Sequence, residues 1–107
     1  MRGFRPAIDM IESETELILV VELAGVKSED IQIQLVEQTL TIRGYRHRPK
    51  IQNANFHQLE IHYGNFRFDL HLPRVVDSAA VDANMDNGLL TVSMPVAQPK
   101  KIEIIKK

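Results

Sequence analysis

The feature that most constrains the fold is a turn between two alternating segments late in the chain. Residues 81–86 and 89–94 each alternate apolar and polar side chains, and Asn87-Gly88 separates them. Alternation with a period of two places the apolar side chains on one face of a strand. An Asn-Gly pair adopts the positive φ values of a two-residue hairpin turn, and Pro95 ends the second strand because proline has no amide proton. The pattern predicts an antiparallel hairpin.

The remaining chain repeats this kind of signal. Residues 31–35 alternate isoleucine or leucine with glutamine, as in a strand with one wet face, whereas residues 17–23 are apolar on both faces. Short strands recur about every 8–12 residues without a sustained helical period, which is typical of an antiparallel sandwich. Residues 77–80 are the one place where we expect a helical turn, capped by Asp77 or Ser78. The sequence predicts one all-β domain.

Composition limits the classes of function. The 107 residues contain no cysteine, which excludes a disulfide framework and thiolate chemistry and is typical of a reducing compartment. No apolar run approaches membrane-spanning length and no apolar signal region follows the first residues, so we expect a cytoplasmic protein without a membrane partner. The 13 basic and 14 acidic side chains nearly cancel, so no long-range field draws in nucleic acid and little repulsion separates copies of the chain.

Candidate catalytic and metal-binding groups are few. The four histidines lack the spacing of a metal site, so we expect solvated side chains and no metal at His47, His57, His62 and His71. A hairpin of residues 57–62 with 66–72 would bring Glu60 opposite Asp69, but such a pair needs a cleft to separate its pKa values. With no nucleophile elbow or phosphate-binding loop, the sequence predicts no enzyme and no cofactor.

The basic run at residues 43–50 interleaves Tyr45 with cations, as nucleic-acid surfaces do. A solvated loop explains the run equally well. Because the whole chain has no basic excess, we expect no nucleic-acid partner.

Six short motifs in one order resemble the α-crystallin domain of the small heat-shock proteins. They are an opening strand at 5–12, [DE]-L-P-G-V at 22–26 with Ala24 in place of proline, L-x-I-x-G at 40–44, Y-G-x-F-x-R-x-F-x-L-P at 63–73, A-x-x-x-N-G-[VL]-L at 83–90, and I-x-I at 102–104. The fourth departs from the family pattern, since Phe68 occupies the arginine position and Leu70 replaces the second aromatic residue. The resemblance implies an immunoglobulin-like antiparallel β-sandwich of about seven to nine strands.

The resemblance also implies a division of the chain and a way to dimerise. It predicts a short arm at residues 1–5, an α-crystallin domain at 6–95 with a dimerisation loop at 45–62, and a tail at 96–107. In bacterial and plant members the strand matching residues 56–61 pairs with the first strand of a partner, which covers two open edges at once. The residues expected in this exchange are Phe56, Leu59, Ile61, Ala7, Asp9 and Ile11. The competing local interpretation is the hairpin of 57–62 with 66–72.

The tail carries the other predicted contact. Ile102 and Ile104 project from one face of an extended chain while Glu103 points away, and lysines flank them. A last edge strand or a frayed end is the alternative. By resemblance the isoleucines anchor oligomers by docking into a groove of another subunit, which also serves as a candidate client site. Its expected lining is Ile31, Ile33, Leu35, Val81, Ala83 and Met85.

The function that this resemblance implies is an ATP-independent holdase that binds unfolded or partly folded client proteins and suppresses their aggregation. We expect a homo-oligomer built from dimers. The alternative from another class is an interaction scaffold resembling the CS-type co-chaperone domain, a monomeric sandwich that docks one defined partner. The loop and the isoleucine tail favour the holdase.

Overall fold

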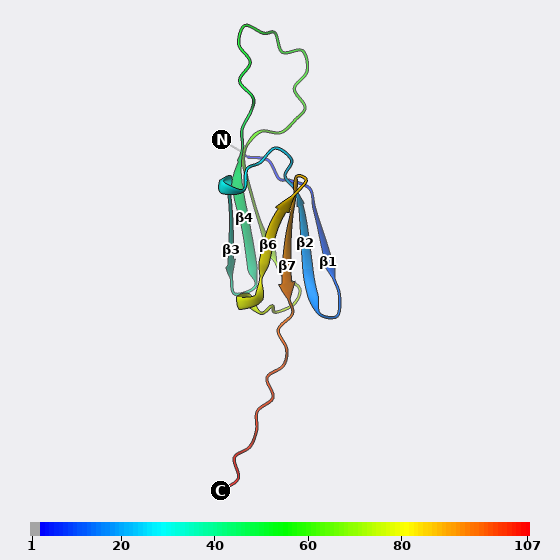
Figure 1. Ribbon diagram of the computed structural model, residues 1–107, viewed down its shortest axis with the longest axis vertical. Helices are drawn as coiled ribbons and strands as arrows, with labels where there is room; N and C mark the ends of the chain where they lie inside the picture. Colours follow the sequence, from blue (N-terminus) through cyan, green and yellow to red (C-terminus); the bar gives the residue numbers. More distant parts are fainter. Residues whose placement is uncertain (1–2) are drawn as a thin grey trace.

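A computed structural model describes residues 3–107 of the chain, which form two antiparallel sheets packed face to face (Figure 1). One sheet has the order β1-β2-β7-β6 and the other the order β3-β4-β5. The strands of the described residues are β1 (Ile8–Glu12), β2 (Glu16–Glu22), β3 (Ile31–Val36), β4 (Thr39–Arg46), β5 (Gly64–His71), β6 (Asp82–Asp86) and β7 (Leu89–Pro95). The predicted all-β sandwich is confirmed.

The hairpin predicted from Asn87-Gly88 is present between β6 and β7. Asn87 and Gly88 have φ values of 51° and 78°, and Asp86 pairs with Leu89 across the turn. A Cβ at Gly88 would lie 3.0 Å from the Cα of Ala24, so the turn also packs against a second loop. Glycine therefore satisfies both a backbone and a space requirement here.

The core lies between the two sheets and follows the period of two. In β2 the fully buried side chains are Leu17, Leu19 and Val21, which face Leu40 and Ile42 of the opposite sheet's central strand in one continuous cluster. The intervening Ile18 and Val20 are only partly buried. Residues 17–23 were expected to be covered on both faces, but only the inner face is fully buried. In the described chain no further layer covers the outer face.

The departure from the family motif at residue 68 is accommodated by the core. Phe68 faces inward from β5 and is 3% exposed, and the guanidinium of Arg5 lies 5.2 Å from its ring centroid. Gly44 of the L-x-I-x-G motif also has a packing reason, because a Cβ there would meet the ring of Phe66. The motif residues thus report how closely β4 and β5 pack.

Two short 3-10 turns complete the fold, η1 (Ser28–Asp30) and η2 (Ser78–Ala80). The second is the predicted capped turn, and the Asp77 carboxylate accepts a bond from the Ala79 amide at 3.2 Å. The first was not predicted. Among residues 3–107 no helix has the length and apolar character needed to cross a membrane.

Two segments leave the sandwich at opposite ends (Figure 1). Residues 47–63 form a long loop between β4 and β5, and residues beyond Val96 extend from the other end as a tail. The described chain therefore measures 82 × 25 × 21 Å along its principal axes.

Candidate functional site

An apolar hollow opens between β3 and β6, the edge strands of the two sheets. Its volume is about 170 Å³, and its lining consists of Ser28, Ile31, Ile33, Ala83, Asn84, Met85 and Leu90. A cavity of about 150 Å³ holds a benzene molecule, so the hollow has room for a branched aliphatic side chain. Its position follows from the fold, because two edge strands lying side by side leave their inward side chains incompletely covered.

The structure brings together four of the six residues predicted to line a groove: Ile31, Ile33, Ala83 and Met85. Leu35 and Val81 lie on the same two strands or beside them but outside the hollow, half-buried against the core. The groove geometry is thus present over part of the predicted length, and its occupant stays a prediction.

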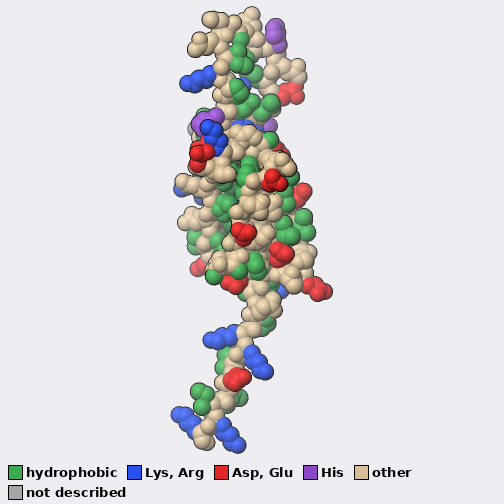
Figure 2. Space-filling view, viewed as in Figure 1, with side chains coloured by type: hydrophobic (Ala, Val, Ile, Leu, Met, Phe, Trp, Pro, Cys, Tyr) green, Lys and Arg blue, Asp and Glu red, His purple; other side chains and the backbone are tan. Residues whose placement is uncertain are grey.

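The tail presents its isoleucines to solvent. Ile102, Ile104 and Ile105 are 78%, 94% and 85% exposed, and none belongs to a strand or helix. Figure 2 shows the tail's cationic side chains, all of them lysines, on both sides of the hydrophobic ones. An apolar segment flanked by cations stays dispersed while undocked. The tail therefore has the composition of a segment that binds elsewhere.

The loop holds the second group of exposed apolar side chains. Phe56, Leu59 and Ile61 are more than half exposed, and with Ile51 and Tyr63 they line a shallow hollow of about 270 Å³. Residues 47–63 contain no strand. The proposed partner strand, β1, pairs only with β2 within the described residues, which leaves its outer edge open; Asp9 and Ile11 are exposed on β1, and Ala7 directly precedes it.

The local alternative, a hairpin of residues 57–62 with 66–72, is wrong. β5 pairs instead with β4, which places Phe68 opposite Ile42 and Leu70 opposite Leu40. Residues 57–62 form no strand on the other edge of β5; near its start that edge is bridged by Phe4, whose amide donates to the carbonyl of Asn65.

The approach of Glu60 to Asp69 belonged to that hairpin alone, and the two carboxylates have separate partners. Asp69 accepts a hydrogen bond from the Thr41 hydroxyl at 2.8 Å and lies 3.6 Å from Arg67. Glu60 instead bonds Gln58 within the loop.

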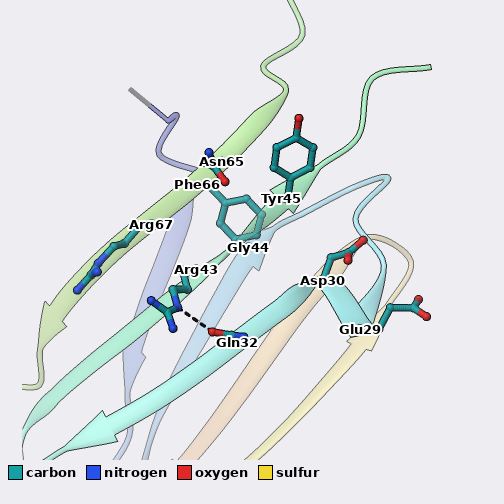
Figure 3. A pocket seen from close by; sticks show the side chains of 9 residues that line it. All are labelled: Glu29, Asp30, Gln32, Arg43, Gly44, Tyr45, Asn65, Phe66 and Arg67. Carbon is teal, nitrogen blue, oxygen red and sulfur yellow. Dashed lines mark hydrogen bonds between the residues drawn. The ribbon is translucent and has the colours of Figure 1, made fainter. Parts of the chain in front are cut away.

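The basic run does not form one continuous surface. Arg43 Nε donates to Gln32 at 2.7 Å on the outer face of β4, Arg46 turns inward, and the Arg48 guanidinium lies 4.4 Å from the ring centroid of Tyr63. Arg43 borders a hollow of about 470 Å³ on the outer face of the β3-β4-β5 sheet (Figure 3). Its walls carry both signs of charge, since Glu29 and Asp30 lie opposite the arginines.

The histidines are dispersed. His57 and His62 lie on the loop, His71 ends β5, and His47 Nε2 lies 3.3 Å from a carboxylate oxygen of Asp30. Within residues 3–107 no three histidine or carboxylate groups come together as a metal site would require.

One residue that the sequence interpretation missed is Arg46, where β4 ends and the loop begins. It is 8% exposed, its Nη1 donates to the carbonyl of His62 at 3.0 Å, and its Nη2 lies 3.7 Å from Glu22 Oε1. An arginine within a basic run is expected to be solvated. Only the alternation of inward and outward positions along the strand could have indicated that Arg46 is buried.

Comparison with known proteins gives a consistent result. The Hsp20/alpha crystallin family profile matches residues 9–107. Small heat shock protein C2 of Rickettsia felis is 32% identical over 103 residues, covering 92% of this chain and 67% of that protein. Heat shock protein 16 of Schizosaccharomyces pombe is 35% identical, covering 94% of this chain and 75% of that protein. Against other similar relatives, such as spore protein SP21 of Stigmatella aurantiaca, the chain spans 63% of their length.

Solved structures agree. Heat shock protein 16.0 from Schizosaccharomyces pombe superposes with a TM-score of 0.81 at 34% identity, covering 97% of this chain and all of that one. A small heat-shock protein from Xylella fastidiosa gives a TM-score of 0.81 at 26% identity, covering 98% of this chain and all of that one.

Proposed function

The chain belongs to the Hsp20/alpha crystallin family, and on that premise we propose that it is an ATP-independent holdase that binds partly unfolded proteins and suppresses their aggregation. The relatives support a chaperone role. The observation that carries the finer proposal is the placement of apolar side chains outside the core. The loop and the tail hold the most exposed of them, and the β3–β6 hollow offers an apolar recess.

Such surfaces suit clients that expose extended apolar segments. Burying one aliphatic side chain contributes about 1.5–3 kcal/mol, and association entropy opposes it, so a single contact is weak and reversible. Several contacts in one assembly give useful affinity without a nucleotide-driven step. The amount of client bound then depends on how many apolar segments of the assembly are undocked at a given moment.

The proposed assembly is a homo-oligomer built from dimers. Strand exchange pairs residues 56–61 of one subunit with β1 of its partner, which uses the unpaired loop and the open edge of β1. Ile102 and Ile104 of the tail dock into the β3–β6 hollow of another subunit. Both contacts join a segment that has no partner within its own described chain to a surface that is incompletely covered.

The proposed division of the chain follows from this assembly: an arm at residues 1–5, of which 1 and 2 lie outside the described residues, a domain at 6–95 and a tail at 96–107. The cysteine-free composition suits a reducing cytoplasm. A monomeric scaffold of the CS type is the alternative, and it leaves the exposed apolar residues of the loop without a role.

The test is aggregation of a heat-labile client followed by light scattering. We expect scattering to fall at an equimolar ratio of this protein, equally with and without ATP, while serum albumin at the same concentration has no effect. Scattering that is unchanged at severalfold excess contradicts holdase activity. A stable one-to-one complex with a folded protein, in the absence of client protection, favours the scaffold.

A further inference from the structure

Arg46 joins the two ends of the loop. It ends β4 opposite Gly64, the first residue of β5, so it lies where the chain leaves the sandwich and returns to it. Its Nη1 donates to the carbonyl of His62, on the returning side. A charged donor at one end of a loop that bonds a carbonyl at the other end ties the two ends together.

The N-terminal segment covers this guanidinium. The ring of Phe4 lies 5.0 Å from the Arg46 guanidinium carbon and stacks on His62 with centroids 5.8 Å apart. The Phe4 amide donates to the carbonyl of Asn65 at 2.9 Å, which adds the segment to the edge of β5. The fit is close, because a Cβ at Gly3 would overlap the same carbonyl. The ring of Phe4 thus contacts both Arg46, where the loop begins, and His62, near the residue where it ends.

The buried guanidinium is incompletely satisfied. Arginine has five N–H donors, and here one makes a good bond while the contact to the half-exposed Glu22 is 3.7 Å long. Arg46 Nε is buried without a hydrogen-bond partner in the part of the chain that the structure describes. Burial of an unpaired donor is unfavourable, so water competes strongly for this group. Phe4 lies over this group, so loss of its ring would open the guanidinium to water.

We propose that Phe4 and Arg46 form a latch on the stem of loop 47–63, so that docking of the N-terminal segment holds the loop ready for strand exchange and its release frees the loop and weakens the dimer. The proposal rests on the strand exchange of the proposed function. The latch is a two-state element, since the guanidinium is either shielded and bonded to His62 or hydrated and free of it. Whatever detaches residues 3–5 from β5 thereby regulates dimerisation at a distance from the exchanged strand.

The test separates the latch from the exchange. Phe4→Leu carries it, because this change keeps apolar volume and leaves Arg46 in place but removes the aromatic face. In a monomeric background, Phe56→Asp with Leu59→Asp, backbone order parameters of residues 61–63 report the loop stem directly. In the wild-type background, sedimentation equilibrium gives the dimer constant. We expect Phe4→Leu to lower the order parameters and to raise the dimer dissociation constant about tenfold, within the range of a partly desolvated cation–π contact.

Two controls sharpen the result. Phe4→Tyr keeps the ring and should restore both measurements. Arg43→Gln removes a cation of the same strand whose partner is Gln32 on the outer face of the sheet, away from residues 61–63, and it should change neither. Unchanged order parameters in the monomeric Phe4→Leu variant overturn the latch whether or not strands exchange. Lower order parameters with an unchanged dimer constant overturn its link to dimerisation. Arg46→Gln, which removes the cation, combined with Phe4→Leu should weaken the dimer no more than Arg46→Gln alone, and additive effects overturn the coupling.

Discussion

Truncating both tail isoleucines should dissociate assemblies larger than the dimer. In the double variant Ile102→Ala with Ile104→Ala, each side chain loses its three outer carbons. The two side chains are 78% and 94% exposed in the undocked tail, so nearly their whole surface is available for burial in a partner's hollow. At about 0.8 kcal/mol per buried carbon, the full loss is about 5 kcal/mol per tail.

The hollow between β3 and β6 is open, so burial there is incomplete. If little more than half of the transfer free energy is realised, each tail loses about 3 kcal/mol, which lowers its docking constant more than a hundredfold. The fold itself should be unaffected, because the exposed tail contributes no core side chain. We therefore expect a lower oligomeric mass with an unchanged melting temperature of the domain.

Light scattering coupled to size-exclusion chromatography at micromolar concentration measures the mass, and differential scanning calorimetry measures the domain. Ile105→Ala is the matched control, since this residue is 85% exposed but faces the opposite way from Ile102 and Ile104 in an extended tail. A double variant that keeps its parent's mass refutes the anchor. Equal losses from Ile105→Ala refute the extended geometry, and a lowered melting temperature indicates an ordinary structural strand.

Three further predictions follow from the loop, a turn and the core. Replacing residues 47–63 with a two-residue turn should join β4 to β5 directly and give a folded monomer by ultracentrifugation; a dimer of this variant contradicts strand exchange. Gly88→Ala should lower the free energy of unfolding by about 1–2 kcal/mol in urea, because φ is positive and Ala24 is close; no loss would mean that the turn relaxes freely. Phe68→Arg, which restores the family's motif, should destabilise the domain by several kcal/mol, since the site is buried and Arg5 already lies over it, whereas equal stability of the two chains would show that the core is not packed on this ring.

The sequence alone determined the parts of the fold that depend on neighbouring residues. Asn87-Gly88 requires positive φ at two consecutive positions, and the alternation on either side selects which side chains face inward; both signals are local, and the β6–β7 hairpin follows them. The capped turn after Asp77 was readable for the same reason. The exposed tail isoleucines were visible as a motif because their spacing is itself the signal.

Tertiary structure decided where equally good local choices competed. Residues 57–62 and 66–72 have the pattern of a hairpin, yet residues 57–62 form no strand, and the outer edge of β5 is bridged at its start by Phe4, about sixty residues away in the chain. Six residues were predicted to line the groove, and four of them line the hollow. The length of the gap between two edge strands depends on the twist of both sheets, which a local pattern does not encode. The burial of Arg46 against Phe4 depends on segments some forty residues apart in the chain, as the numbers of the two residues show, and no local pattern encodes such a contact.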